Sequence, residues 1–282
     1  VYRGNSKINE RSAWTAVPLG KSQGNLSLTG TLEFEYPLGK SSKNFVLVPY
    51  ISGSGLQNKT TSPVSTNFDM DAGLDVKLSL SSSLNLDLTF NPDFSQVEVD
   101  EQRTNLTRFE LFYPEKREFF IDNADLFTDL GSRSTKPMFT RRIGIAKDTT
   151  TNQYVQNPIV YGAKFAGKIN EGLRIGVLNM QTARLKSSGI PSFNYGMAVL
   201  EKKILTNSKI LAFLVNKDAT FNPTEDSYSI DLNHFNRVFG FESKIKSKDT
   251  KWNSEVYYHQ SLKIRNIKID LLMVLILLTN RL

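Results

Sequence analysis

The 282-residue chain contains no cysteine and only two histidines, His234 and His259. The absence of cysteine excludes a disulfide framework and any metal site that is built on thiolates. Neither histidine has a second histidine or a carboxylate at the spacing of a metal site. Both are therefore expected to be ordinary strand side chains that face a lumen or an interface.

Long apolar runs are also missing. The longest one, Leu271–Leu278, is well short of the roughly 20 residues that a membrane-spanning helix needs. The chain begins at Val1, and the opening VYRGNSKINERSAW has no apolar signal-peptide core, so we expect that upstream residues are missing. Any crossing of a membrane would have to use the strands of a closed barrel.

Motifs of the common enzyme classes are absent. The sequence has no G-x-S-x-G, no H-E-x-x-H, no phosphate-binding loop and no EF-hand loop. The net charge is +7, but the lysines and arginines are scattered along the sequence through strands and turns, which does not indicate a basic patch or helix face. Nucleic acid is therefore not an expected partner.

Strand patterns dominate what is present. In Gly73–Phe90, every second residue is apolar and the residues between are polar, with a turn at Ser81–Ser83. The same reasoning predicts about ten strands in all. The others lie at Leu26–Tyr36, Phe45–Ser52, Pro158–Ile169, Leu173–Ala183, Phe193–Leu205, Lys209–Asp218, Tyr228–Ser247 and Lys251–Ile264.

Two architectures share this pattern. A soluble antiparallel sheet buries its apolar face in a core, whereas a membrane barrel turns that face to lipid and lines a lumen with the polar face. The connections alternate between tight turns and longer polar loops, which is typical of an up-and-down membrane barrel. We therefore predict an all-β fold, an antiparallel up-and-down transmembrane β-barrel within residues 26–264, with a soluble β-sandwich as the alternative.

One segment, Asn91–Gly144, interrupts the strands and is dense in charged and aromatic residues. Its carboxylates Asp93, Glu98, Asp100 and Glu101 have three interpretations: an acid–base pair of a carbohydrate-active hydrolase, calcium ligands, or ion-pair partners of nearby arginines and lysines. We prefer the third, which predicts no cofactor and no catalytic residue. The segment is then a partly irregular, partly helical plug or cap over the lumen, with a helical turn near FELFYPEK. Phe119 and Phe120 are expected to pack as its small apolar anchor. Its other charged residues are expected to pair with charges of the lumen, namely Glu115, Lys116, Arg117, Arg141 and Arg142.

The two ends of the chain break the pattern. Residues 1–25 are polar and irregular, which indicates a linker from a missing upstream domain. Residues 265–282 lose the alternation. They are either a buried strand, a short helix, or a non-native tail, and we favour the tail. On that interpretation the barrel is an incomplete, open and curled sheet whose first or last strand is unpaired.

The interrupting segment also resembles a known family. The run NPDFSQVEVDEQRTNLTRFELFYPEKREFFIDNADLF followed by FTRRIG is similar to the signature of a bacterial outer-membrane β-barrel family of unknown function. In that family the barrel usually follows a family-9-type carbohydrate-binding module. RGNSKINERSAW, VPYISG, YGAKFAGKI and NYGMAVLEKKILTNSKILAFLVN extend the resemblance to about residues 1–260. The module itself is absent here, and the strands stop near Ile264.

The resemblance implies a location more than an activity. It predicts the outer membrane, contact with its lipid or lipopolysaccharide, an upstream carbohydrate-binding module and a glycan as a candidate substrate, with passage, display or handling of that substrate as the role. It does not settle whether the full-length protein is an enzyme. We expect no enzymatic activity from this portion. The residues that match the signature are Asn91, Pro92, Asp93, Phe94, Gln96, Glu98, Asn105, Phe109, Glu110, Pro114, Glu115, Lys116, Arg117, Phe119, Phe120, Arg141 and Arg142.

Overall fold

The structure is a computed structural model in two compact units, Val1–Ser42 and Lys43–Leu282. It describes residues 2–5, 10–13, 15–16, 18, 30–36, 44–58, 65–92, 115–132, 136–148, 154–186, 188–220, 235–248, 252–263 and 272–279.

In the first unit, β1 (Tyr2–Asn5) pairs with β2 (Glu10–Ala13) in an antiparallel hairpin, within a region expected to be irregular. The strand predicted at Leu26–Tyr36 does not form in its described part, residues 30–36. Leu32, Phe34 and Tyr36 are all exposed there. Alternation alone is not sufficient, because a strand also needs a neighbour that pairs its backbone groups.

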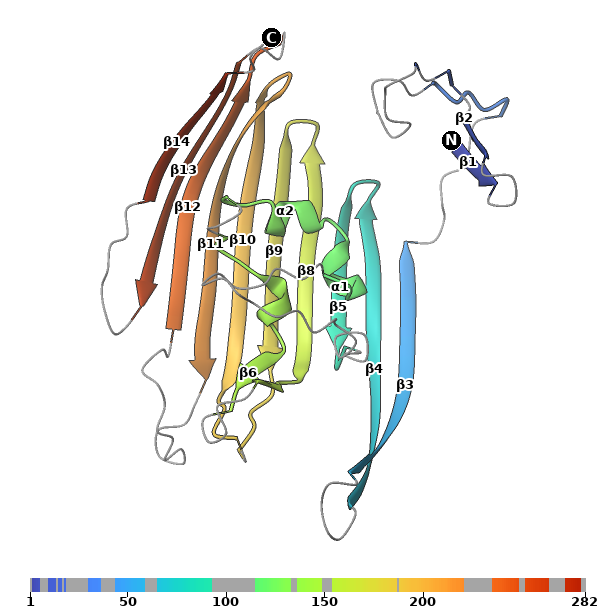
Figure 1. Cartoon of the computed structure of the whole chain (residues 1–282), viewed down its shortest axis with the longest axis vertical. Coiled ribbons are helices and arrows are strands. Elements are labelled where there is room, and N and C mark those ends of the chain that lie inside the picture. The colour runs from blue at the N-terminus through green and yellow to red at the C-terminus, as the bar shows by residue number, and fades with distance from the viewer. Residues whose placement is uncertain are drawn as a thin grey trace. The chain divides into compact units, whose positions relative to one another are not determined.

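The second unit is organised around one antiparallel sheet with the order β14-β13-β12-β11-β10-β9-β8-β5-β4-β3 (Figure 1). Each strand pairs with its neighbours in the chain, and only β6 and β7 stand outside this sequence. The strands are β3 (Phe45–Asn58), β4 (Ser65–Ser81), β5 (Leu84–Phe90), β8 (Ile159–Asn170), β9 (Leu173–Thr182), β10 (Ser192–Leu205), β11 (Ser208–Thr220), β12 (Phe235–Lys246), β13 (Trp252–Lys263) and β14 (Leu272–Thr279).

The all-β class, the antiparallel order and the hairpins are therefore confirmed. Two-residue turns at Ser82–Ser83, Glu171–Gly172 and Thr206–Asn207 join successive strands, as does the short link 247–251. The longer connections, 59–64, 91–158, 183–191, 221–234 and 264–271, alternate with them. Because neighbouring strands are antiparallel, all the short connections lie at one end of the sheet, the short-turn end, and all the long ones at the other, the long-loop end.

The sheet does not close into a ring in the described part of the chain. β3 pairs only with β4 and β14 only with β13, so these two strands are its edges. The described part of the chain therefore forms an open sheet with unpaired edge strands, as predicted, and no closed barrel. Residues 272–279, which lie in the stretch predicted to be an atypical tail, form the edge strand β14; whether that stretch is native stays a prediction. No helix in the described ranges is long and apolar enough to cross a membrane.

The cross-strand register separates two different faces of the sheet. One row consists of apolar residues from six adjacent strands, namely Leu86, Phe165, Val177, Ala198, Leu214 and Phe239. The next row points to the opposite face and begins with two charges, in the order Asp87, Lys164, Leu178, Met197, Val215 and Val238. Successive side chains of a strand alternate between faces, so the sheet has an apolar outer face and a mixed inner face.

We call the segment between β5 and β8 the insertion, and its described parts lie on the inner face (Figure 1). It contains α1 (Glu118–Ile121), α2 (Ala124–Thr128), the single 3₁₀ turn η2 (Thr140–Arg142) and the small hairpin of β6 (Ile145–Lys147) and β7 (Tyr154–Gln156). Helices of one turn have almost no intrinsic stability, so packing on the sheet holds them. The residues of the expected helical turn at FELFYPEK lie mostly outside the described residues.

Candidate functional site: the interface between insertion and sheet

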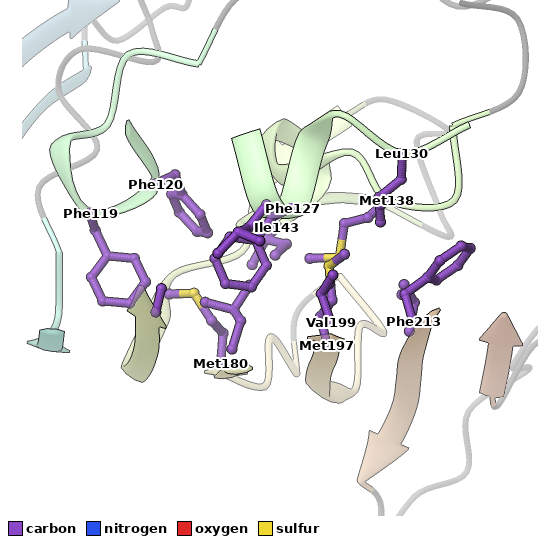
Figure 2. Packing of buried hydrophobic residues seen from close by; sticks show 14 of the residues in the cluster. Phe119, Phe120, Phe127, Leu130, Met138, Ile143, Met180, Met197, Val199 and Phe213 are labelled. Atoms are coloured by element: carbon purple, nitrogen blue, oxygen red, sulfur yellow. The ribbon is translucent and has the colours of Figure 1, made fainter. Parts of the chain in front are cut away.

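The centre of the interface is apolar. Phe119, Phe120 and Phe127 of the insertion are each less than a tenth exposed, and they belong to one buried cluster with Met180, Val199 and Phe213 of the sheet (Figure 2). Phe119 and Phe120 meet edge to face with their centroids 5.2 Å apart. Each buried phenylalanine contributes roughly 1.5–3 kcal/mol through removal of apolar surface from water. The expected apolar anchor of the insertion, formed by Phe119 and Phe120, is therefore larger than those two residues.

Gly176 on β9 provides the space for one of these rings. A Cβ atom at this position would lie 2.8 Å from Cζ of Phe127. Real carbon contacts of that kind are longer than 3.0 Å, so a residue without a Cβ atom lets the end of the Phe127 ring approach the strand this closely. The fit between one glycine of the sheet and one ring of the insertion sets the depth at which α2 sits.

A buried lysine fixes the insertion beside this apolar centre. Lys164 on β8 is 1% exposed, and its Nζ lies 3.0 Å from a carboxylate oxygen of Asp87 on β5. The same ammonium group donates hydrogen bonds to the carbonyl oxygens of Phe119 and, at 3.0 Å, of Asp122. A lysine has three donors, and here one is used by the sheet and two by the insertion.

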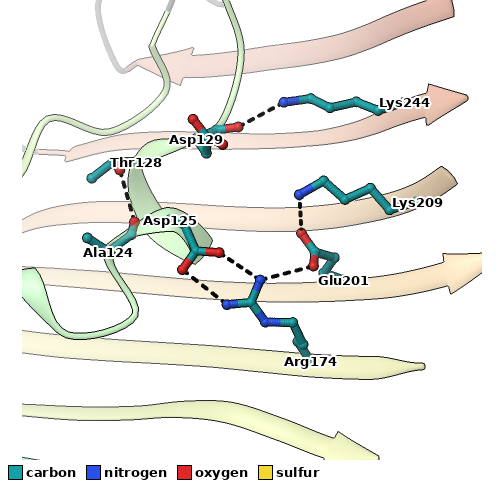
Figure 3. Close-up of polar contacts among 8 residues, drawn as sticks. All are labelled: Ala124, Asp125, Thr128, Asp129, Arg174, Glu201, Lys209 and Lys244. Carbon is teal, nitrogen blue, oxygen red and sulfur yellow. Dashed lines mark hydrogen bonds and ion pairs between the residues drawn. The ribbon is translucent and has the colours of Figure 1, made fainter. Parts of the chain in front are cut away.

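Three further contacts join charged groups across the interface at its rim. Lys77 of β4 binds Glu118 at 2.8 Å and Asp122 at 2.9 Å. On the other side of α2, Arg174 of β9 holds both oxygens of Asp125, at 2.7 and 3.0 Å (Figure 3). Such a two-bonded guanidinium–carboxylate pair fixes orientation as well as position.

The insertion also touches β12. Lys244 donates a hydrogen bond to the carbonyl oxygen of Asp129 at 3.2 Å, and the amide of Gly131 donates one to Oε1 of Glu242 at 2.6 Å. Glu242 is fully buried and lies 3.0 Å from Nε2 of His259 on β13. Polar contacts therefore connect the insertion to β4, β8, β9 and β12, on both sides of its apolar centre.

Within the insertion, Arg117 is the organising residue. Its guanidinium group binds both carboxylate oxygens of Glu115, at 2.9 and 2.8 Å, and donates to the carbonyl oxygens of Ile143 and Thr140, each at 2.7 Å. It also stacks 4.2 Å from the ring centre of Phe120. Burial raises the pKa of Glu115, but the hydrogen bonds and charge of Arg117 outweigh it and hold that pKa below its usual value. Arg117 thereby ties the beginning of α1 to η2.

The structure places nine of the seventeen signature residues. Asn91 adopts a left-handed conformation with φ of 47° and ties the exit of β5 to Ala72 and Val160 by hydrogen bonds. Pro92 is buried beside it. Glu115, Arg117, Phe119 and Phe120 come together as described, Arg141 is buried in η2, and Lys116 and Arg142 are exposed. The remaining eight lie outside the described residues: Asp93, Phe94, Gln96, Glu98, Asn105, Phe109, Glu110 and Pro114.

The predicted partners of the insertion's charges differ from those observed. Glu115 was expected to pair with charges of the lumen, yet its partner is Arg117 of the same segment. The residues that contact the sheet, Glu118, Asp122 and Asp125, were not singled out, nor were Lys164 and Arg174. A lysine and an arginine at the polar positions of otherwise ordinary strands were the available signal, but a single sequence does not say which carboxylates they meet.

No group of three or more histidine, cysteine or carboxylate residues in the described ranges is arranged to hold a metal ion. The carboxylates considered as calcium ligands or as a catalytic pair, Asp93, Glu98, Asp100 and Glu101, lie outside those ranges. His259 contacts Glu242 and the ring of Phe213, while His234 also lies outside the described residues.

The Asp125–Arg174 pair predicts how the docking of α2 on the sheet depends on pH. The hydrogen bonds and charge of Arg174 lower the pKa of Asp125 below its usual 3.8, against the effect of burial. A lowered folded-state pKa stabilises docking above pH 3.8, and this contribution is lost as the pH falls through the folded value. We expect α2 to loosen below about pH 4, measured as faster pepsin cleavage near Phe127 relative to a free peptide of the same sequence.

The matched control is Asp125→Asn. This variant lacks the titrating group, so its relative cleavage rate should already be raised at pH 4 and should change less between pH 4 and pH 2. Identical pH profiles for the two proteins would contradict the assignment.

A family model described as a domain of unknown function (DUF5916) matches residues 43–261, so the chain belongs to that family. The match begins just before β3, ends within β13 and contains the whole insertion. No curated protein and no solved structure matches the chain.

Proposed function

We propose that this member of the family is an outer-membrane β-barrel protein in which the insertion acts as a plug or gate for the passage of a substrate. The apolar outer face of the sheet carries the proposal. Val177, Leu200 and Leu214 are 40%, 47% and 49% exposed, on the face opposite the insertion. A soluble sheet would cover such a face with a second layer, whereas lipid covers it in a membrane barrel.

The inner face supports the same proposal. It carries buried charges, Lys164, Asp87 and Glu242, which the hydrocarbon of a bilayer would not accommodate. A barrel lumen accommodates charges, and the insertion lies on this face and offers hydrogen-bond partners to Lys164 and Glu242. The outer membrane lipid or lipopolysaccharide is then the partner of the outer face.

The insertion suits a gate because its contacts at the rim are reversible. The Lys77 and Arg174 pairs are partly exposed, and exposed ion pairs contribute only about 0–1 kcal/mol each. A substrate that competes for these groups could release the insertion. We propose a glycan as that substrate, delivered by a carbohydrate-binding module upstream in the full-length protein.

Lipid also sets a requirement on the edges of the sheet. Unpaired backbone groups in hydrocarbon cost several kcal/mol each. In the membrane, β3 and β14 must therefore both be paired, with each other or with further strands.

The absence of cysteine allows a direct test, because single-cysteine variants can be labelled at one site. In β10, Leu200→Cys faces outward and Lys203→Cys faces inward. With a polarity-sensitive fluorophore and the protein refolded into liposomes, we expect quenching by spin-labelled lipid at position 200 and by aqueous iodide at position 203.

A second pair of positions, on another strand, serves as the control. Phe241→Cys and Lys244→Cys of β12 should repeat the alternation. Equal access of iodide to all four positions, or recovery of the protein in the soluble fraction without detergent, would overturn the proposal.

A further inference from the structure

A groove of about 530 Å³ lies at the short-turn end of the sheet. It is formed by β8 to β13 and the turns between them, away from the apolar centre of the interface. Its lining includes six cationic residues and three carboxylates. These are Lys168, Arg174, Lys203, Lys209, Lys244, Lys246, Glu171, Glu201 and Glu255. We call it the basic groove.

Three of these lysines lie directly side by side. Lys203 of β10 is opposite Lys209 of β11, which is opposite Lys244 of β12. Neighbouring strands are about 4.8 Å apart, and like charges directly opposite one another destabilise a sheet. A row of three lysines across adjacent strands is thus unfavourable to folding unless an anion compensates it.

The carboxylates in the groove compensate only part of this charge. Glu201 binds Arg174 at 3.2 Å and Lys209 at 2.7 Å (Figure 3). The carboxylate of Glu255 accepts a hydrogen bond from the hydroxyl group of Tyr257. Across the described part of the chain, Lys168, Lys203 and Lys246 form no ion pair, and Lys244 donates only to the carbonyl of Asp129.

Neutral polar groups complete the lining, namely Thr206, Asn207 and Asn253. Hydroxyl and amide groups of this kind bind sugar hydroxyls, whereas lysines act as point charges for phosphate. The volume lies within the range of small-molecule sites, about 300–1,000 Å³.

We propose that the basic groove binds a phosphorylated saccharide. Its phosphoryl groups lie between Lys203, Lys244 and Lys168, and its hydroxyls face the neutral side chains. Such a group occurs free, as a sugar phosphate, or as the headgroup of a glycolipid. The proposal concerns the groove alone and holds whether or not the outer face lies in a membrane.

The test is calorimetric titration of the whole chain with two probes at fixed ionic strength. Fructose 1,6-bisphosphate represents the free form, and lipid A in mixed micelles represents the headgroup. Fructose is the uncharged control and should not bind. We expect the double variant Lys203→Gln/Lys244→Gln to raise Kd by about tenfold or more, the loss expected when charged hydrogen bonds are removed.

Lys202→Gln is the matched control, because Lys202 neighbours Lys203 but belongs to the opposite face and does not line the groove. It should leave Kd within about twofold, as surface changes away from a site usually do. A second, ligand-free measurement checks folding: the double variant should melt no lower than the wild type, because it removes like-charge repulsion.

Binding of the bisphosphate identifies the free sugar phosphate as a source, and binding of lipid A alone identifies the headgroup. If neither probe binds, or if the double variant and Lys202→Gln bind equally well, the proposal is wrong.

Discussion

Replacing Lys164 by methionine should destabilise the second unit by about 3–5 kcal/mol, the cost of leaving one partner of a buried ion pair alone. Asp87 would remain as a buried carboxylate without its cation, since its side chain is only 6% exposed. The carbonyl oxygens of Phe119 and Asp122 would lose their donor as well. Denaturant unfolding, followed by tryptophan fluorescence, measures the change.

A double replacement separates charge from shape. In Lys164→Met/Asp87→Leu neither charge of this buried pair is left, and apolar replacements of buried pairs are often neutral. We expect the double variant to recover most of the lost stability, while the insertion remains less firmly held through its two carbonyls. If the double variant is as unstable as the single one, the charge is not the cause.

The same pair of variants bears on the proposed gate. In a planar bilayer, both should raise the open fraction of the pore, because both remove the donor that Lys164 offers to the insertion. The exposed Lys202→Met serves as the control and should alter neither stability nor conductance.

The second large effect is expected at Phe127. Phe127→Ala removes a ring that is 3% exposed, at a cost of about 3–5 kcal/mol for a phenylalanine in a packed core. The effect should fall on the docking of the insertion, because the ring lies between α2 and Gly176 of β9. Hydrogen exchange should then show faster exchange in α1 and α2, while the amides of β9 and β10 stay protected.

Gly176→Ala provides the complementary change. The added methyl group would meet the ring at 2.8 Å, so this variant alone should also loosen α2. Combined with Phe127→Leu, which shortens the side chain, the methyl group should be tolerated, and the two changes should couple by about 0.5–3 kcal/mol. Strict additivity would mean that the two residues do not touch.

The strands were predictable because the residue patterns that specify them, alternation and turns, are local in the sequence. Alternation in Gly73–Phe90 and the turn at Glu171–Gly172 locate hairpins without any knowledge of distant residues, and antiparallel neighbours then follow in order. The face that carries the insertion was predictable in outline, since charged residues alternate with the leucines of β4 and β5.

The docking of the insertion was not predictable in the same way. The carboxylate of Asp122 meets Lys77 across 45 residues of sequence, and that of Asp125 meets Arg174 across 49. Nothing in the spacing of these residues selects those partners from the many carboxylates of the insertion. The described part of the strand expected at Leu26–Tyr36, residues 30–36, is not a strand for a related reason, because its alternation has no adjacent strand to pair with in the described residues.

The points at which the insertion leaves and rejoins the sheet have a mechanical consequence. Both lie at the long-loop end, where Asn91 is tied to Ala72 and Val160, and the buried Asn157 is tied to Thr182 at 3.1 Å. Arg174, which holds α2, lies at the opposite end, next to the turn at Glu171–Gly172. The insertion is thus a flap with its hinge at one rim and its latch at the other. Movement of the insertion away from the sheet would need this latch, the apolar centre and the Lys164 contacts to release together, and it would pivot at the two attachments.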